Sequence, residues 1–321
     1  MIEAAKKLMP KVTIISAVGI TSLALGACGG GFQPAPEPVG PPPIPAVTGS
    51  ATELQRVFES VHDTYWPRAS QDGKYVLAHQ RDDTKLGGER FSIVRVQVGS
   101  PGITPVSEGF ADKPAWYPDN RRFVYTSTRT GSPRVVRSNA MGLGSGLTFV
   151  TSSISASSET NPDVSPDGKK IAFNTTIRNQ VLLATVNSDG SEFTLYGEGV
   201  IPRWSPDGTK IAFQRAVGNW FQIFTMDLSS GGQVSQITAG EVNHYMPTWS
   251  PDGSRIAYIS DRADGRHLWI MTAEGANQTQ LTSGSAEEVH PDWGHDGRIY
   301  FSSNAGGRYN VWRLRPVLEG M

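Results

Sequence analysis

Residues 202–208 read Pro-Arg-Trp-Ser-Pro-Asp-Gly, and residues 247–253 repeat this text as Pro-Thr-Trp-Ser-Pro-Asp-Gly. More divergent copies lie before and after them, and the six copies start at Pro67, Pro114, Pro162, Pro202, Pro247 and Pro291. Successive copies are 47, 48, 40, 45 and 44 residues apart. A sequence repeat of roughly 40 to 50 residues is typical of propellers and solenoids, so this spacing indicates the fold before any local pattern does.

Each repeat predicts four short strands. In the copy that begins at Pro247, strands are expected at residues 247–250, 255–260, 267–272 and 278–282. Pro251-Asp252-Gly253 predicts the first turn, because proline presets φ, aspartate caps its own backbone and glycine accepts positive φ. Four antiparallel strands per repeat match one propeller blade. We therefore predict an all-β, six-bladed propeller over residues 51–321.

The sixth repeat is one strand short. Its strands are expected near residues 290–293, 298–303 and 309–314, and the sequence ends at Met321. Residues 53–58 resemble the fourth-strand segments at 235–238 and 279–282. Since proteins avoid exposed strand edges, we predict that residues 54–58 supply the missing outer strand of the last blade. The alternative is a three-stranded last blade, with residues 51–60 outside the sheet.

The most uniform residues of the repeat have structural explanations. Four tryptophans occupy equivalent positions, as packing between blades requires, and the repeated aspartate has the chemistry of a turn residue. We therefore assign to the core and the turns, rather than to a binding site, Trp116, Trp204, Trp249 and Trp293, with Asp72, Asp119, Asp167, Asp207, Asp252 and Asp296.

The N-terminus has the pattern of an export signal. Lys6, Lys7 and Lys11 precede an apolar run that is shorter than a transmembrane helix and ends in Leu-Gly-Ala-Cys28. Cys28 is the only cysteine of the chain, and the segment resembles the bacterial lipobox. We predict a lipoprotein signal peptide at 1–27 and a lipidated Cys28 followed by a Pro/Gly-rich linker at 28–50. The alternative is an ordinary signal peptide with an incidental cysteine.

Composition excludes several classes of function. The chain has a formal net charge of −1, and removal of residues 1–27, with three lysines and one glutamate, leaves −3. We therefore expect no nucleic-acid partner. A single cysteine cannot form an intrachain disulfide, so packing alone must hold the blades. We find no nucleophile elbow, phosphate-binding loop or zinc-protease motif. We expect a monomer without a cofactor or catalytic residues.

The six Pro-Asp-Gly repeats resemble the WD40-like repeat of the TolB C-terminal propeller, from about residue 53 onward. The N-terminal α/β domain of TolB has no counterpart here, and a lipobox takes the place of its ordinary signal. The resemblance implies a bacterial envelope protein that binds other envelope proteins, such as a peptidoglycan-associated lipoprotein, through a propeller face. Gly29 after the cysteine, rather than aspartate, implies the periplasmic face of the outer membrane.

Counting back from each repeat proline identifies six loops that lead into the predicted inner strands. Function in a propeller is usually carried by loops at a channel mouth. These loops contain carboxylates, aromatic residues and histidines, and Lys113 is the exception to a near absence of basic residues. We predict a partner-binding rim formed by His62, Tyr65, Trp66, Glu108, Phe110, Asp112, Glu159, Glu241, His244, Tyr245, Glu287, Glu288 and His290.

An acidic rim with aromatic anchors favours a basic or amphipathic segment of a protein partner. The unexceptional alternative is a set of solvated loops with scattered charges. Carbohydrate or peptidoglycan binding by the rim aromatics is a further alternative. The fourth is a metal-dependent lyase resembling oligogalacturonate lyases, with His62, His244 and His290 beside Glu241 or Glu288. A rim without basic residues disfavours the lyase, because its substrate carries carboxylates.

Overall fold

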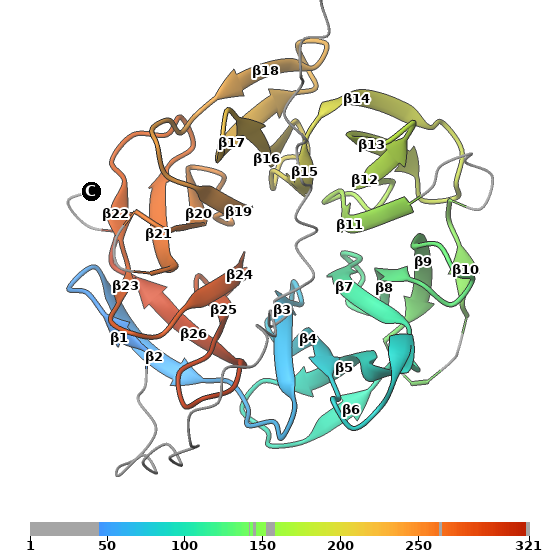
Figure 1. Cartoon of the computed structure of the whole chain (residues 1–321), viewed down its shortest axis with the longest axis horizontal. Coiled ribbons are helices and arrows are strands. Elements are labelled where there is room, and N and C mark those ends of the chain that lie inside the picture. Colours follow the sequence, from blue (N-terminus) through green and yellow to red (C-terminus); the bar gives the residue numbers. More distant parts are fainter. Residues whose placement is uncertain (1–44, 141, 144–145, 152–157, 263–264, 319–321) are drawn as a thin grey trace, which may run out of the picture. The chain divides into compact units, whose positions relative to one another are not determined.

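The computed structural model describes residues 45–140, 142–143, 146–151, 158–262 and 265–318. Within them, six four-stranded antiparallel sheets are arranged in a ring (Figure 1). The prediction of an all-β, six-bladed propeller is confirmed. The described part contains one short 3-10 helix, η1 (Gly87–Arg90), and no helix long and apolar enough to cross a membrane. The predicted signal peptide and Cys28 lie outside the described residues.

In each of the first three blades, the order of the strands in the sequence is also their order in the sheet, from the innermost to the outermost strand. Blade 1 consists of β3 (Asp63–Ala69), β4 (Tyr75–Arg81), β5 (Phe91–Gln97) and β6 (Ile103–Pro105). Blade 2 consists of β7 (Ala111–Trp116), β8 (Arg122–Ser127), β9 (Arg134–Asn139) and β10 (Thr148–Phe149). Blade 3 consists of β11 (Ser158–Val164), β12 (Lys170–Ile177), β13 (Gln180–Asn187) and β14 (Thr194–Glu198).

Blades 4 and 5 repeat this order, and blade 6 departs from it. Blade 4 consists of β15 (Val200–Trp204), β16 (Lys210–Val217), β17 (Trp220–Asp227) and β18 (Gln233–Gln236). Blade 5 consists of β19 (His244–Trp249), β20 (Arg255–Ser260), β21 (His267–Thr272) and β22 (Thr279–Gln280). Blade 6 consists of β24 (Glu288–Trp293), β25 (Ile299–Ser303), β26 (Asn310–Pro316) and β2 (Ala51–Arg56).

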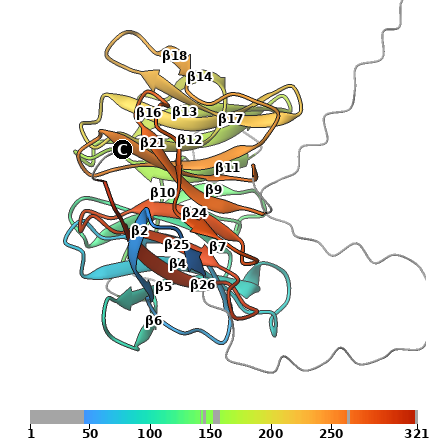
Figure 2. The same ribbon diagram turned by 90° about the vertical axis from the view of Figure 1, so that its left-hand side faces the viewer.

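The N-terminal strand closes the ring, as predicted. Strand β2 pairs antiparallel with β26, so that Ala51 lies opposite Pro316, and Figure 2 shows this blade from the side. The strand begins three residues before the predicted segment and ends at Arg56, with a register shift inside it. A second contact was not predicted: β1 (Ala46–Val47), in the stretch assigned to the linker, pairs with β23 (Thr282–Ser283) at the edge of blade 5.

The repeated Ser-Pro-Asp-Gly segment forms the turn between the first two strands of a blade. In blade 5, the Ser250 hydroxyl donates to Asp252 Oδ1 at 2.6 Å and accepts from the Arg255 amide at 2.9 Å. Gly253 completes the turn with a φ of +73°, which glycine adopts without strain. The aspartate is therefore a turn residue in the structure, as predicted.

The repeated tryptophan joins neighbouring blades. Trp249 of blade 5 is 7% exposed and packs in one cluster with Ile223 of blade 4 and Tyr258 of its own blade. Its indole Nε1 donates to the Arg203 carbonyl of blade 4 at 3.1 Å, and Trp116 makes the equivalent bond to Arg68 at 2.8 Å. Apolar burial and one directed hydrogen bond thus fix the angle between blades.

The strand order gives the propeller two different mouths. The loops that lead into the inner strands and the loops between the second and third strands open on one face, which we call the entry mouth. Backbone hydrogen bonds join these two kinds of loop, for example Thr128 N to Phe110 O at 3.0 Å and Glu288 N to Arg266 O at 2.8 Å. The Pro-Asp-Gly turns open on the opposite face, the turn mouth.

Candidate functional site

All six inner strands contain the same irregularity at the repeat proline. Each pairing register shifts across the dipeptide that ends in this proline. The residue before the proline has a left-handed φ between 52° and 57° in every blade, although none is glycine. Such a conformation is disfavoured for a side chain with a Cβ, so the blade architecture imposes it. We call these residues the channel ring: Trp66, Lys113, Asn161, Ile201, Met246 and His290.

The channel ring is a connected set of side chains. Trp66 stacks on His290 with ring centroids 3.8 Å apart, and Lys113 Nζ lies 5.8 Å from the Trp66 ring. The His290 amide donates to Met246 Sδ at 3.4 Å. Beneath the ring, a crevice of about 10 Å³ is lined by Trp66, Lys113, Asn161 and other residues. That volume holds about one water molecule.

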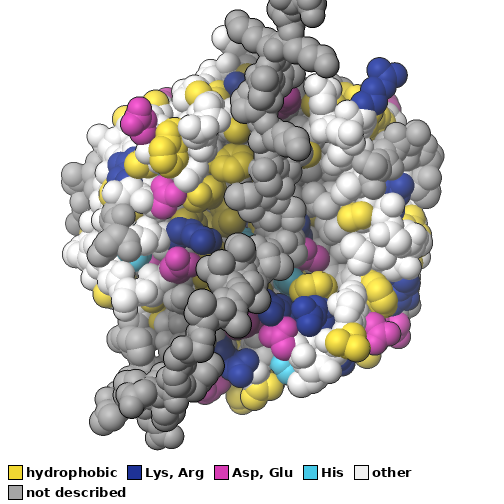
Figure 3. Space-filling view, in the orientation of Figure 1, with side chains coloured by type: hydrophobic (Ala, Val, Ile, Leu, Met, Phe, Trp, Pro, Cys, Tyr) yellow, Lys and Arg dark blue, Asp and Glu magenta, His cyan; other side chains and the backbone are white. Residues whose placement is uncertain are grey.

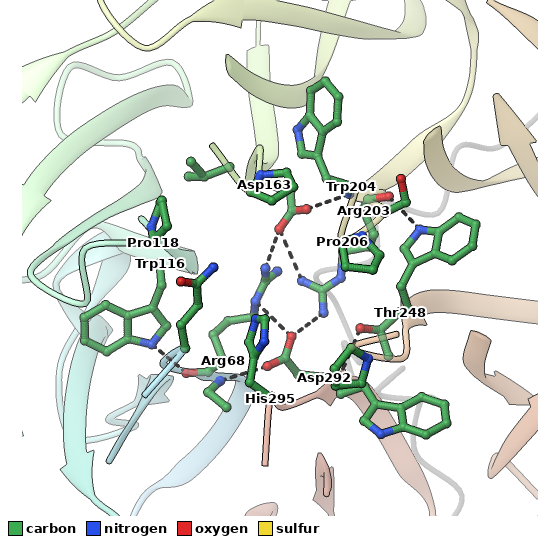
Figure 4. Close-up of a pocket in the computed structure, with 18 of the residues that line it drawn as sticks. Arg68, Trp116, Pro118, Asp163, Arg203, Trp204, Pro206, Thr248, Asp292 and His295 are labelled. Carbon is green, nitrogen blue, oxygen red and sulfur yellow. Dashed lines mark hydrogen bonds and ion pairs between the residues drawn. The ribbon is translucent and has the colours of Figure 1, made fainter. Parts of the chain in front are cut away.

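A second layer of the channel consists of four charged residues, which we call the ion quartet: Arg68, Asp163, Arg203 and Asp292 (Figure 4). Arg68 pairs with Asp163, and its Nε lies 3.1 Å from Asp292 Oδ1. Arg203 lies 2.9 Å from Asp292 and 3.7 Å from Asp163. Each arginine therefore contacts both aspartates, and four blades meet at the axis through alternating charges.

Backbone amides of neighbouring blades hold the two aspartates of the quartet in place. Asp163 Oδ2 accepts from the Trp204 amide, and Asp292 Oδ2 accepts from the Ala69 amide, both at 2.8 Å. Burial alone would lower the pKa of Arg68, but the two carboxylates outweigh it and raise that pKa. Burial raises the pKa of Asp163 and Asp292, and the charge of Arg68 opposes that shift. The quartet is therefore an anchored plug of paired side chains between the two mouths.

A pocket of about 170 Å³ opens at the turn mouth, and the ion quartet forms its floor (Figure 4). Its walls include the four repeated tryptophans, which are only 7–8% exposed. The sequence analysis assigned these tryptophans to the core, and their burial and inter-blade packing agree with that. The charges of the floor satisfy one another, so the floor offers a ligand few free hydrogen-bonding groups.

The structure places the predicted rim residues at three depths of the entry mouth. Glu108 and Glu241 are exposed at its edge. The half-buried residues are His62, Tyr65, Trp66, Phe110, Asp112, Tyr245, Glu287 and His290. The buried ones are Glu159, His244 and Glu288, all 0% exposed. These last three cannot touch a partner at the surface, which corrects their assignment to the rim.

The two buried glutamates connect successive blades. Glu288 accepts from Thr282 at 2.7 Å and from Ser303 at 3.1 Å, and His267 Nδ1 lies 3.0 Å from it. Glu159 accepts from Thr151 in the same way, and burial raises the pKa of its carboxyl. Both side chains link the end of one blade to the beginning of the next. They were predicted on the rim because the position of a residue in the sequence does not show how deeply its side chain is buried.

Arginines neutralise much of the rim charge. Arg129 lies 3.0 Å from Glu108, and Arg266 lies 3.8 Å from Glu287. Both arginines belong to loops between second and third strands, which open on the same face as the predicted loops. The expected shortage of basic residues came from counting one loop per blade instead of two. Basic and acidic side chains also lie beside one another on the face drawn in Figure 3.

The three histidines considered for a metal site have separate surroundings. His62 lies 3.6 Å from Asp82, and His244 is buried beside Arg262 and Tyr258. His290 belongs to the channel ring. Among the described residues, no group of three or more His, Cys, Asp or Glu side chains could hold a metal ion. The described part of the chain thus offers no ligand set for the lyase alternative.

His79, which was expected from the sequence to carry no chemistry, lies against Asp112 of the predicted rim. His79 Nδ1 is 3.0 Å from Asp112 Oδ1, and Tyr65 packs between the rings of His79 and His290. Burial lowers the pKa of His79, and burial together with nearby positive charge lowers that of His290 still further. Both rings are therefore neutral at neutral pH. His79 lies inside strand β4, so no loop-based search would have selected it.

The six repeated blades around a charged axis define a six-bladed propeller. A family model described as "TolB beta propeller domain" matches residues 155–268 and 199–316, which together span half of the chain. The chain therefore belongs to the TolB β-propeller family. A search of curated proteins found no match.

Solved structures share the fold. A protein of Agrobacterium tumefaciens assigned as TolB superposes with a TM-score of 0.63 at 20% identity, covering 83% of this chain and 98% of that one. TolB from Acinetobacter baumannii gives 0.64 at 18% identity, covering 74% of this chain and 58% of that one. An oligogalacturonate lyase from Vibrio parahaemolyticus gives a TM-score of 0.55 at 11% identity, covering 84% of this chain and 95% of that one. At these identities the likeness concerns the fold alone.

Proposed function

We propose that this protein is a lipid-anchored scaffold of the bacterial envelope that binds a protein partner at the entry mouth. The observation that carries the proposal is the aromatic floor of that mouth. The ion pairs of the quartet cross the axis below the channel ring, so a partner meets large side chains rather than an open pore. Such a surface suits a protein segment better than a small substrate.

The entry mouth contains the residue types that anchor protein interfaces. Trp66, Tyr65 and Tyr245 are half-buried at its centre. Val61 and Leu86, in loops that open on the same face, are 78% and 83% exposed. Aromatic anchors surrounded by polar groups are typical of binding hot spots. The charge pairs at the edge would orient the partner more than they would add affinity.

The proposed location rests on the sequence. Lipidation of Cys28 would attach the propeller to a membrane through the Pro/Gly-rich linker, and several acyl chains together would anchor it stably. Gly29 favours the outer membrane, with the propeller in the periplasm. Family membership favours an envelope partner, and a peptidoglycan-associated lipoprotein is the first candidate.

A crosslinking pull-down from envelope fractions tests the proposal. The wild-type propeller is compared with Trp66→Ala and with Glu108→Lys/Glu241→Lys, which alter the centre and the edge of the entry mouth. The matched control, Glu192→Lys/Glu274→Lys, makes the same charge change on exposed loops of the turn mouth. We expect Trp66→Ala and the entry-mouth pair to lose a protein that the control retains. Equal capture by all four proteins would contradict the proposal, and capture of polysaccharide alone would favour the carbohydrate alternative.

A further inference from the structure

Lys113 is an unusual member of the channel ring. The residue is 7% exposed, and its nearest carboxylate oxygen, Asp112 Oδ2, is 3.6 Å from Nζ. The ammonium donates no hydrogen bond to any residue of the described part. Lysine is seldom buried unless its charge is paired and hydrogen-bonded, because an ammonium carries three strong donors. The Lys113 ammonium is thus held in the channel ring by one long ion pair, without a hydrogen bond to the described residues.

Other buried polar atoms without partners lie around this lysine. Asn161 Oδ1 and His290 Nδ1 belong to the same ring, and His79 Nε2 belongs to the layer beside it. None of these atoms has a hydrogen-bond partner within the described residues. More than nine-tenths of buried polar groups are ordinarily paired, so these exceptions indicate a place that a ligand completes. Asn161 Oδ1 can only accept a hydrogen bond, so this ligand must also carry a donor, such as a peptide N–H, beside any anionic group.

The surrounding charges favour an anion at this position. Below the ring, Arg68 and Arg203 are matched by the two aspartates of the ion quartet, so that layer is neutral. Asp112 Oδ1 lies 3.0 Å from Nδ1 of the neutral His79 ring, and Asp112 Oδ2 lies 3.6 Å from Lys113 Nζ, which is too long for a hydrogen bond. Among biological acceptors, a carboxylate makes strong, short hydrogen bonds with an ammonium.

The aromatic neighbours fit what would accompany that carboxylate. The centroid of the Trp66 ring lies 5.8 Å from Lys113 Nζ, and the same ring stacks on His290. The ring centroids of Tyr65 and Tyr309 are 4.8 Å apart. These rings offer apolar surface within one side chain's length of the ammonium. A ligand that carries an apolar group next to its carboxylate would use both.

We propose that the centre of the entry mouth is a carboxylate-binding site, in which Lys113 holds an acidic group of the protein partner and Trp66 packs against the adjacent apolar group. This inference deepens the proposed function and rests on it for the nature of the ligand. It also gives the partner a chemistry that the acidic rim did not suggest. The edge of the mouth would accept mixed charges, whereas its centre would select a negative one.

Three small probes separate the sources of the carboxylate. N-acetyl-phenylalanine carries a chain-end carboxylate, N-acetyl-aspartyl-phenylalaninamide carries a side-chain carboxylate, and N-acetyl-phenylalaninamide carries neither. Binding to the full propeller is followed through the indole Nε1–H resonances of ¹⁵N-tryptophan-labelled protein, with Trp66 assigned by Trp66→Phe. We expect at least one acidic probe to shift the Trp66 resonance saturably, and to bind about tenfold more tightly than the neutral amide.

Variants of Lys113 test the residue itself. Lys113→Met removes the charge at similar length and should cost about tenfold in affinity, whereas Lys113→Arg should retain binding. Lys169→Met, on an exposed turn of the turn mouth, is the matched control. If Lys113→Met does not fold, the affinities of the acidic and neutral probes for the wild type and for Lys113→Arg still test the carboxylate site.

The two proposals can fail separately. Equal shifts with acid and amide, or unchanged binding in Lys113→Met, would overturn the carboxylate site. If the pull-down captures a protein that Lys113→Met still binds fully, the scaffold function stands and the carboxylate site falls. If acidic probes bind but no protein is captured, the carboxylate site stands and the protein scaffold is contradicted.

Discussion

The ion quartet makes a quantitative prediction, because its charges are buried and balanced. Asp292→Asn removes one negative charge while keeping the shape of the side chain. Asp292 Oδ1 is within 3.1 Å of Arg68 Nε and 2.9 Å of Arg203 Nη2, so the variant leaves two guanidinium groups to share Asp163. Breaking a buried ion pair by removing one partner costs about 3 to 5 kcal/mol. We expect a loss of that size in the free energy of unfolding.

The double variant Arg203→Met/Asp292→Asn separates charge imbalance from other effects. It removes one charge of each sign and leaves the pair of Arg68 with Asp163. Because the imbalance is gone, the double variant should lose less stability than the sum of the single variants, by about 1 to 3 kcal/mol. Asp83→Asn, at a half-exposed ion pair with Arg81, is the surface control and should change stability by less than about 1 kcal/mol.

The assay is equilibrium unfolding in urea at neutral pH, followed by tryptophan fluorescence. A thermal scan provides a second measure, since about 1 kcal/mol corresponds to about 2 to 4 °C in a domain of this size. A change below about 0.5 kcal/mol in Asp292→Asn would place it among ordinary surface substitutions and would refute the account of the plug. Strict additivity of the two single variants would refute the claim that the charges act as one unit.

Three further predictions address the tryptophans, the histidines and the anchor. Trp249→Phe should cost about 1 to 3 kcal/mol more in urea unfolding than Trp204→Phe, because Trp249 donates to Arg203 O whereas Trp204 Nε1 has no partner among the described residues; equal losses would contradict this. Burial lowers the pKa of His290 in the folded state, so unfolding takes up a proton below about pH 6.5 and stability falls with decreasing pH. His290→Gln should flatten this decline by up to about 1.4 kcal/mol per pH unit, and an unchanged slope in urea unfolding between pH 6 and 5 would argue against a neutral His290. Cys28→Ser should move the protein from the membrane to the soluble fraction of cells and abolish labelling with radioactive palmitate; persistent labelling would disprove lipidation at this residue.

The sequence determines the blades because the repeat combines turn chemistry with alternation. The second and third strands of blade 5 were predicted at residues 255–260 and 267–272, where β20 and β21 lie. Closure by the N-terminal strand followed from the need to cover an edge. Strand β2 lies at Ala51–Arg56 rather than at the predicted residues 54–58. Its position depends on pairing with β26, which the local sequence does not show.

The site was harder to predict because depth and face depend on neighbours in space. Glu159 and Glu288 appear equivalent to Glu108 in the sequence, yet the first two are buried between blades. Arg129 lies at the entry mouth although it belongs to a different loop class. Only the assembled ring shows which loops share a face.

A signal for the ion quartet was present in the sequence. The residues after the repeat prolines read Arg68, Ala115, Asp163, Arg203, Thr248 and Asp292, and all of them except Ala115 line the pocket of the turn mouth. Two residues of each charge at equivalent positions of a ring predict mutual neutralisation. The predicted rim was based on the residues before the prolines, and the residues after them carry the charges of the quartet.

Photo-crosslinking in growing cells tests the central claim most directly. A benzoylphenylalanine is placed at Glu241 on the edge of the entry mouth, or at Glu274 on the turn mouth, in the full-length protein. The account predicts a discrete crosslinked protein from position 241 that is lost on adding Lys113→Met, and no such product from position 274. A product from position 274 alone, or identical products from both, would contradict a partner site at the entry mouth.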